Sequence, residues 1–180
     1  MKMNKKIIGL TAFKGSGKTT VARKLQNSPF LPKDVAILSF ASPLKEMAAV
    51  LLAPEAFLPE NKEDPNYGIC GRSPRHIMQT LGTEWGREKI SPHLWLEIMR
   101  RRIKSCHSPT VIVDDVRFDN EAELLADLGG KIFRVEREGV KGCDSHVSER
   151  SIDEYWLDGI IVNRTLEDLD SMVRIWNPYQ

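Results

Sequence analysis

Residues 12–19 read Ala-Phe-Lys-Gly-Ser-Gly-Lys-Thr and follow a short apolar run, Ile7-Ile8-Gly9-Leu10. A glycine-rich loop between a strand and a helix turns backbone N–H groups toward an anion at the helix N-terminus, where the helix dipole favours negative charge. The lysine of such a loop reaches the β- and γ-phosphates, and the next Thr offers a hydroxyl to Mg²⁺. The stretch therefore predicts a phosphate-binding loop for a nucleoside triphosphate, with Val21 to Leu25 in the helix that follows.

The residues of this loop form the first candidate site. Gly15 and Gly17 permit backbone angles and a close approach to phosphate that a Cβ would block. Ala12 stands where the motif usually has its first Gly, a residue that mainly closes the turn. The expected ATP contacts in the loop are Lys14, Gly15, Ser16, Gly17, Lys18, Thr19 and Thr20.

Composition and charge limit the kinds of partner. The 180 residues are 41% hydrophobic and fit one soluble domain. The net charge of +1 provides no general basic field, so we expect no nucleic-acid partner. Three widely spaced Cys residues indicate neither a disulfide framework nor a zinc site. The apolar stretch from Met47 to Ala53 is far shorter than the ~20 residues of a membrane span, and the expected location is the cytoplasm.

Short apolar runs rich in β-branched residues alternate with helical patterns along the chain. This alternation is typical of a doubly wound α/β domain, in which helices cover both faces of a parallel sheet. Asp119 is the expected N-cap of the helix after the third run, Gly129 is expected just past its end, and Thr165 to Leu169 begin the last helix. The five expected strands are Lys6 to Leu10, Val35 to Phe40, Thr110 to Asp114, Lys131 to Val135 and Gly159 to Val162.

About 70 residues separate the second and third expected strands, although a crossover between parallel strands needs only a dozen or more. The excess predicts a helical insertion at about 41–108 within a single domain spanning residues 1–180. Ser-Pro pairs at 42–43, 73–74 and 91–92 each predict a Ser N-cap with Pro at the first helical position. Lys45 and Arg75 follow two of these starts, where a cation and a helix N-terminus can together hold an anion.

Two carboxylates, Asp114 and Asp115, follow the apolar run from Thr110 to Val113. At nucleotide sites with a phosphate-binding loop, an Asp in this position holds Mg²⁺ directly or through water. Asp114, Asp115 and Thr19 are therefore the candidate metal ligands, and Asp115 is preferred for contact with substrate or metal. The alternative is that the carboxylates only cap the following helix.

Four further blocks add to the loop, and two of them, Leu-Gly-Thr-Glu-Trp-Gly-Arg and Asp-Val-Arg-Phe, are more specific than the loop alone. Residues 72–87 contain Leu-Gly-Thr-Glu-Trp-Gly-Arg, residues 115–121 begin Asp-Val-Arg-Phe, residues 40–45 read Phe-Ala-Ser-Pro-Leu-Lys, and residues 144–149 read Asp-Ser-His-Val-Ser-Glu. With these blocks the chain resembles the phage-type deoxynucleoside monophosphate kinases over most of its length. The resemblance implies a fold like that of the nucleoside monophosphate kinases and transfer of the ATP γ-phosphoryl group to a dNMP with Mg²⁺. It also implies a location in the host cytoplasm if the chain is phage-encoded.

The insertion would hold the acceptor. Because a monophosphate is already largely ionised at neutral pH, positioning and charge neutralisation suffice, and no general base is needed. Trp85 or Trp95 would stack on the base, although packing against their own helices fits the sequence equally well. Gly82 is interpreted first as a helix C-cap and second as a point of close approach to substrate. The expected dNMP contacts are Lys45, Arg75, Gln79, Gly82, Thr83, Trp85, Trp95, Asp115 and Arg117, and the expected catalytic residues are Lys18, Arg75, Arg117 and Arg137.

A polar, cationic segment at about 137–156 is expected to close over the phosphates and exclude water. The basic residues expected to take part are Arg134, Arg137, Lys141, His146 and Arg150. For His146 alone, a hydrogen-bonded structural role is favoured over a catalytic one. By analogy with nucleoside monophosphate kinases, Asn163 is expected beside the adenine, so that Arg137 and Asn163 complete the ATP contacts.

Two other functions stay open from the sequence. One is a different small-molecule kinase on the same scaffold, resembling dephospho-coenzyme A kinase. The other is a nonenzymatic nucleotide-dependent switch, which the cations and aromatic residues of the insertion disfavour. Small-molecule nucleotides are the expected partners, and whether the chain forms a homodimer also stays open.

Overall fold

The fold is that of a computed structural model, which describes residues 5–13, 15–29, 31–140 and 152–164. The chain divides into two compact units. One is formed by residues 1–39 together with 102–180, and the other by residues 40–101. The second unit nearly coincides with the insertion expected at about 41–108.

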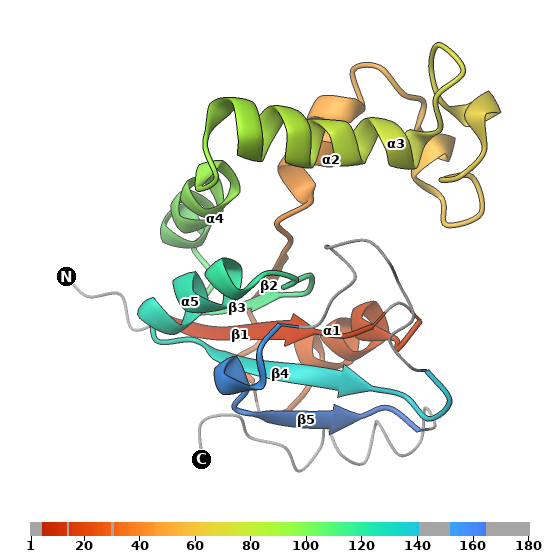
Figure 1. The fold of residues 1–180 in the computed structure, drawn as a ribbon. Helices are drawn as coiled ribbons and strands as arrows, with labels where there is room; N and C mark the ends of the chain where they lie inside the picture. The colour runs from red at the N-terminus through yellow and green to blue at the C-terminus, as the bar shows by residue number, and fades with distance from the viewer. Residues whose placement is uncertain (1–4, 14, 30, 141–151, 165–180) are drawn as a thin grey trace. The chain divides into compact units, whose positions relative to one another are not determined.

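The first unit is built on a five-stranded parallel sheet with strand order β2-β3-β1-β4-β5 (Figure 1). Ile8 of the central strand lies opposite Ile112 of β3 and Lys131 of β4. The loop that follows β1 therefore leaves the carboxyl edge of the sheet at its middle, where ligands bind in open α/β sheets. The strands are β1 (Lys6–Thr11), β2 (Val35–Leu38), β3 (Thr110–Val113), β4 (Lys131–Glu136) and β5 (Gly159–Val162).

Helices cover both faces of this sheet. Ile8 and Leu10 belong to a buried cluster with Val21 and Leu25 of helix α1 (Lys18–Gln26). The opposite face of β1 meets helix α5 (Asp119–Asp127): a Cβ added to Gly9 would lie 2.8 Å from Leu125 Cδ1. The prediction of a doubly wound α/β fold with five parallel strands is thus confirmed, with strand ends within two residues of those expected.

The ends of α5 show one wrong and one correct prediction. The N-cap is Phe118, and Asp119 is the first helical residue. The buried carboxylate of Glu121 serves this helix start instead, because it accepts hydrogen bonds from the backbone N–H groups of Arg117 at 2.9 Å and Phe118 at 3.3 Å. Gly129 follows the C-cap with φ of 78°, as predicted. The helix expected from residue 165 lies outside the described residues.

The second unit is mainly helical. It contains a small core in which Ala48, Leu52 and Ala56 are buried against partly buried apolar side chains that include Ile77 and Leu81. None of the helices in the described ranges is long and apolar enough to cross a membrane. Its elements are α2 (Ser42–Ala48), the 3₁₀ turns η1 (Pro54–Phe57) and η2 (Pro65–Tyr67), α3 (Pro74–Gln79), the π-helix η3 (Thr80–Ile90) and α4 (Leu94–Ser105), whose last residues belong to the first unit.

The three predicted Ser N-caps have different outcomes. Ser73 caps α3 as expected, because its Oγ accepts from the backbone N–H of His76 at 3.3 Å. The prediction for Ser42 is wrong: it is already helical, and the N-cap of α2 is Ala41. The prediction for Ser91 is also wrong, because α4 begins only at Leu94, after a turn in which Ser91 Oγ accepts from the N–H of His93 at 3.2 Å.

Candidate functional site

The phosphate-binding loop joins β1 to α1 in the conformation that an anion requires. Gly15 and Gly17 have φ of 86° and 84°, angles that residues with a Cβ rarely adopt. Gly17 is the N-cap of α1 and provides no capping side chain, and the first turn of the helix contains no acidic residue. The N–H groups of this turn can therefore meet an anion that the helix dipole also favours.

The side chains of the loop fit a phosphate ligand. Lys18 Nζ donates to the Ala12 carbonyl at 3.1 Å, so a hydrogen bond links the end of the loop to its beginning. Thr19 and Thr20 are exposed. Ser16 is 1% exposed, and its buried Oγ has no hydrogen-bond partner among the residues that the structure describes. A buried hydroxyl without a partner is costly, and a bound phosphate oxygen would satisfy it. Lys14 lies outside the described residues.

Asn163 contacts this loop from the end of β5. Its Nδ2 donates to the Ser16 carbonyl at 2.9 Å, and the residue is 8% exposed. A Cβ added to Gly17 would lie 2.3 Å from the same nitrogen. The sequence suggested adenine as the neighbour of Asn163, whereas the structure turns the side chain toward the loop itself.

The carboxylates after β3 lie at the same edge of the sheet as the loop, since β3 is parallel to β1 and adjacent to it. The backbone N–H of Asp114 donates to the Leu38 carbonyl of β2 at 3.1 Å. Asp115 Oδ2 accepts from Ser39 Oγ at 2.6 Å. Ser39 is a site residue that sequence reasoning missed, because its role depends on β2 pairing with β3.

Asp114 and Asp115 are the carboxylates at this edge of the sheet that could hold a metal ion. In the described ranges no three His, Cys, Asp or Glu side chains gather as metal ligands. Mg²⁺ at a nucleotide commonly takes only one or two carboxylates and completes its shell with water and phosphate. Thr19, Asp114 and Asp115 therefore stay predicted ligands.

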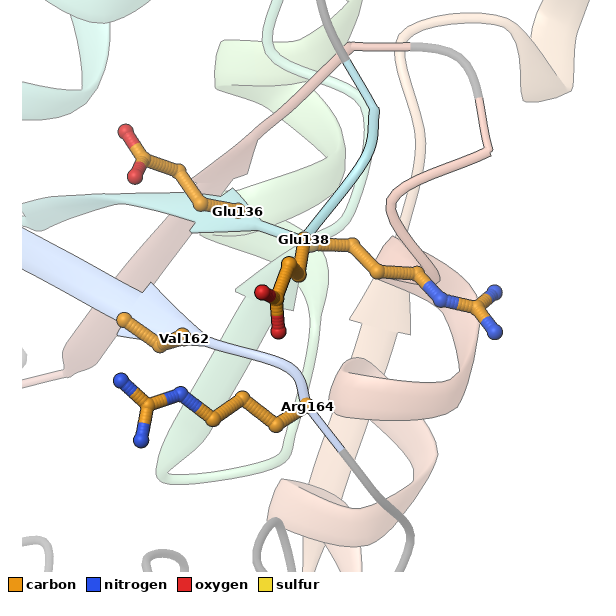
Figure 2. Close-up of a pocket in the computed structure, with 5 residues that line it drawn as sticks. Glu136, Glu138, Val162 and Arg164 are labelled. Carbon is orange, nitrogen blue, oxygen red and sulfur yellow. The ribbon is translucent and has the colours of Figure 1, made fainter.

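A pocket of about 390 Å³ opens where β4 and β5 end. Figure 2 shows Glu138 and Arg164 just past the ends of the two strands, with Glu136 turned away on the other side of β4. The volume is within the range of small-molecule sites. The pocket contains Arg137, one of the expected catalytic residues, and its lining is Glu136, Arg137, Glu138, Val162 and Arg164.

Arg134 has a different role from the one expected. It is 8% exposed, and its guanidinium donates to Glu154 Oε1 at 3.1 Å and to the Ile152 carbonyl at 3.3 Å. These bonds fasten the chain around residues 152–154 to β4, so the expectation that Arg134 closes over phosphates is corrected. Arg117 is exposed just before α5. Lys141, His146 and Arg150, with most of the segment predicted at about 137–156, lie outside the described residues.

In the second unit, Arg75 lies in the first turn of α3. Its Nε is ion-paired with Glu63, and its backbone N–H donates to the Lys62 carbonyl at 2.8 Å. Gln79 and Thr83 follow at intervals of four residues along α3 and η3, and both are partly buried. Lys45 is exposed on α2. Glu63 was not expected at the site, since a loop carboxylate has no sequence signal that links it to Arg75.

The π-helix explains the glycines of the Leu-Gly-Thr-Glu-Trp-Gly-Arg block. Trp95 is 2% exposed, and its Nε1 donates to the Gly82 carbonyl at 2.8 Å. A Cβ on Gly86 would lie 2.5 Å from Trp95 Cζ2. Gly82 is thus inside a helix, so the prediction of a helix C-cap is wrong. Of the two roles left open for Trp95, the structure shows packing, here against η3. Trp85 is 40% exposed and keeps a surface for stacking.

The predicted site residues divide between the two units. The donor-side and strand-end residues belong to the first unit, and the acceptor-side residues of the insertion belong to the second. In the first unit they are Gly15, Ser16, Gly17, Lys18, Thr19, Thr20, Asp114, Asp115, Arg117, Arg137 and Asn163; in the second they are Lys45, Arg75, Gln79, Gly82, Thr83, Trp85 and Trp95.

Comparison with known proteins gives consistent results. A family model described as deoxynucleotide monophosphate kinase matches residues 60–173. A putative deoxynucleotide monophosphate kinase of Acanthamoeba polyphaga mimivirus is 35% identical over an alignment of 191 residues, gaps included, that covers 93% of each chain. The deoxynucleoside-5'-monophosphate kinase of Escherichia phage T5 is 40% identical over 76 residues, 42% of this chain and 30% of that protein. The crystal structure of TT1252 from Thermus thermophilus aligns with a TM-score of 0.52 and 19% identity over 93% of each chain, a likeness of fold.

Proposed function

The chain belongs to the deoxynucleotide monophosphate kinase family, and we propose that it transfers the γ-phosphoryl group of ATP to a dNMP, giving dNDP and ADP. The observation that carries this proposal is the combination of a formed phosphate-binding loop with a family match that includes most of the second unit. A triphosphate site alone would equally serve a switch. The second unit provides the additional cations and aromatic surface that a second substrate needs.

ATP would bind in the first unit. The N–H groups of the loop and the Lys18 ammonium would neutralise charge on the triphosphate, and the orphan hydroxyl of Ser16 would gain a partner. The pocket at the ends of β4 and β5 would take the nucleoside part, with Arg137 and Arg164 on its wall. Mg²⁺ bound with ATP would neutralise developing phosphate charge, and Thr19, Asp114 and Asp115 are the residues that would hold it.

The dNMP would bind on the second unit. The guanidinium of Arg75 suits a monophosphate because its planar fork can donate two parallel hydrogen bonds. Glu63 pairs with that guanidinium and would orient it. Lys45 adds a second cation, and the exposed face of Trp85 suits a base. Because the acceptor phosphate is already ionised, catalysis would consist of alignment and charge stabilisation.

A coupled assay of ADP release, with ATP and Mg²⁺ present, tests the proposal. We expect multiple turnovers that depend on an added nucleotide and are faster with dNMPs than with NMPs. Turnover with dephospho-coenzyme A but not with any dNMP would identify a different kinase. Slow ATP hydrolysis unaffected by every acceptor would identify a switch.

A further inference from the structure

Asn163 joins two parts of the first unit that are 147 residues apart in sequence. Its backbone N–H donates to the Glu136 carbonyl at 2.7 Å, which ties the end of β5 to the end of β4. Its side-chain Nδ2 then donates to the Ser16 carbonyl at 2.9 Å. Both Asn163 and Ser16 are buried, so this bond is shielded from competing water.

The bond acts on one peptide plane of the phosphate-binding loop. In a trans peptide the C=O of one residue and the N–H of the next point in opposite directions. With the Ser16 carbonyl held toward Asn163, the N–H of Gly17 must point away from Asn163. A flip of this plane requires rotation about ψ of Ser16 and φ of Gly17, and Gly17, with φ of 84°, lacks the Cβ that would limit its share of the rotation. The hydrogen bond from Asn163 opposes this flip, because the Ser16 carbonyl would lose its donor.

We propose that Asn163 is a positioning residue that orients the Gly17 N–H toward the triphosphate by holding the Ser16 carbonyl. Donors already aimed at the ligand need no reorganisation when charge arrives, which is the source of their strength. The position of Asn163 also excludes a larger residue at position 17, because a Cβ on Gly17 would lie 2.3 Å from Asn163 Nδ2. The inference rests on the proposed function only in taking ATP as the ligand.

Two substitutions at this position and one matched control test the proposal. Asn163→Ala removes the donor, and Asn163→Asp keeps the shape but places an acceptor and a negative charge against the Ser16 carbonyl. Asn27→Ala is the control, because Asn27 Nδ2 also donates to a backbone carbonyl, that of Arg23 at 2.9 Å, but at the exposed far end of α1. The measurements are kcat and KM for ATP and for dNMP, direct binding of ATP and of inorganic tripolyphosphate, and thermal unfolding.

We expect Asn163→Ala to raise the KM and Kd for ATP about tenfold. This is near the largest loss of affinity that removal of one hydrogen bond causes. Asn163→Asp should raise them further, and both variants should bind tripolyphosphate more weakly. The KM for dNMP should stay unchanged, and Asn27→Ala should match the wild type throughout. If Asn163→Ala does not fold, the shape-conserving Asn163→Asp variant provides the same comparison.

A purely structural role would give a different pattern. If both variants lose thermal stability while their affinities for ATP and tripolyphosphate equal those of the wild type, the proposal is overturned. If the wild type binds tripolyphosphate but phosphorylates no dNMP, the proposed function fails, and the comparison of tripolyphosphate affinities still decides the role of Asn163. If the wild type binds neither ATP nor tripolyphosphate, both proposals fail.

Discussion

Glycine has different purposes in the phosphate-binding loop and in the π-helix η3. Gly15 has φ of 86° and Gly17 has φ of 84°, and a Cβ on Gly15 would meet nothing within 4 Å in the described part of the chain. Gly82 and Gly86 are buried, and a Cβ on Gly86 would lie within 3 Å of three atoms of the Trp95 indole. The loop glycines are required by backbone conformation, whereas the helix glycine at 86 is required by the side chain packed against it.

This difference explains why the function of the phosphate-binding loop can be predicted from its own residues, whereas the block in η3 indicates a function only by resemblance to a family. A phosphate-binding loop is a local object, because its ligand chemistry is carried by neighbouring backbone groups. The glycines of η3 have no such local meaning, since their partner Trp95 comes from the next helix. If this comparison is correct, changes in the loop should affect catalysis, and changes at the Gly86–Trp95 contact should affect stability.

The largest effect is expected for Lys18→Ala. Removing the ammonium group should lower kcat by about 100-fold or more, equivalent to roughly 3 kcal/mol of transition-state stabilisation. Thermal unfolding should change little, because Lys18 is only partly buried. Lys24→Ala, at the other end of the same helix, should retain wild-type turnover. Normal turnover in a folded Lys18→Ala protein would remove the loop from the reaction.

Gly86→Ala tests whether the contact between Gly86 and Trp95 contributes to stability. The added methyl group must displace the Trp95 ring, and overpacking of this kind costs about 1–3 kcal/mol in the free energy of unfolding. Urea or thermal unfolding measures the loss. Glu88→Ala is the control, since Glu88 is exposed on the same π-helix and should unfold like the wild type. Unchanged stability of Gly86→Ala would show that the Gly86–Trp95 contact is not required.

Arg75→Ala tests whether the helical segment formed by α3 and η3 also contacts the substrate. A charged hydrogen bond lost to the monophosphate should raise the KM for dNMP about tenfold and leave the KM for ATP unchanged. Arg101→Ala provides the comparison, because Arg101 is also paired with a carboxylate, Glu97 at 2.9 Å, but lies on the exposed side of α4. A selective rise in the KM for ATP would instead assign Arg75 to the donor side.

The smallest effect is expected for Trp95→Phe. This change removes the Nε1 donor to the Gly82 carbonyl and should cost about 1 kcal/mol in the free energy of unfolding. Trp85→Phe is the control, because it makes the same chemical change at a residue that is 40% exposed. The free energy of unfolding of this variant should stay near that of the wild type. Equal unfolding curves for the two variants would show that the buried indole bond contributes no measurable stability.

Much of the first unit could be predicted from sequence. The five strands were predictable because buried parallel strands are short, apolar runs, and a run of this kind is a local pattern. The phosphate-binding loop and Gly129 were predictable because positive φ selects glycine at the residue itself. Helix starts were less predictable: Ser73 caps a helix, but Ser42 and Asp119 are already helical and Ser91 precedes a turn.

Only the tertiary structure decided which distant residues meet. The sheet order brings Ser39 to Asp115 and Asn163 to Ser16, and folding of the second unit places Trp95 against Gly82 and Gly86. No pattern within a short window could predict these pairs, because each depends on how separate elements are placed in space. The sequence determined the loop, the strands and the class of chemistry, since these follow from local conformation and residue type. The structure decided which residues hold that chemistry in position, since side chains far apart in sequence do so.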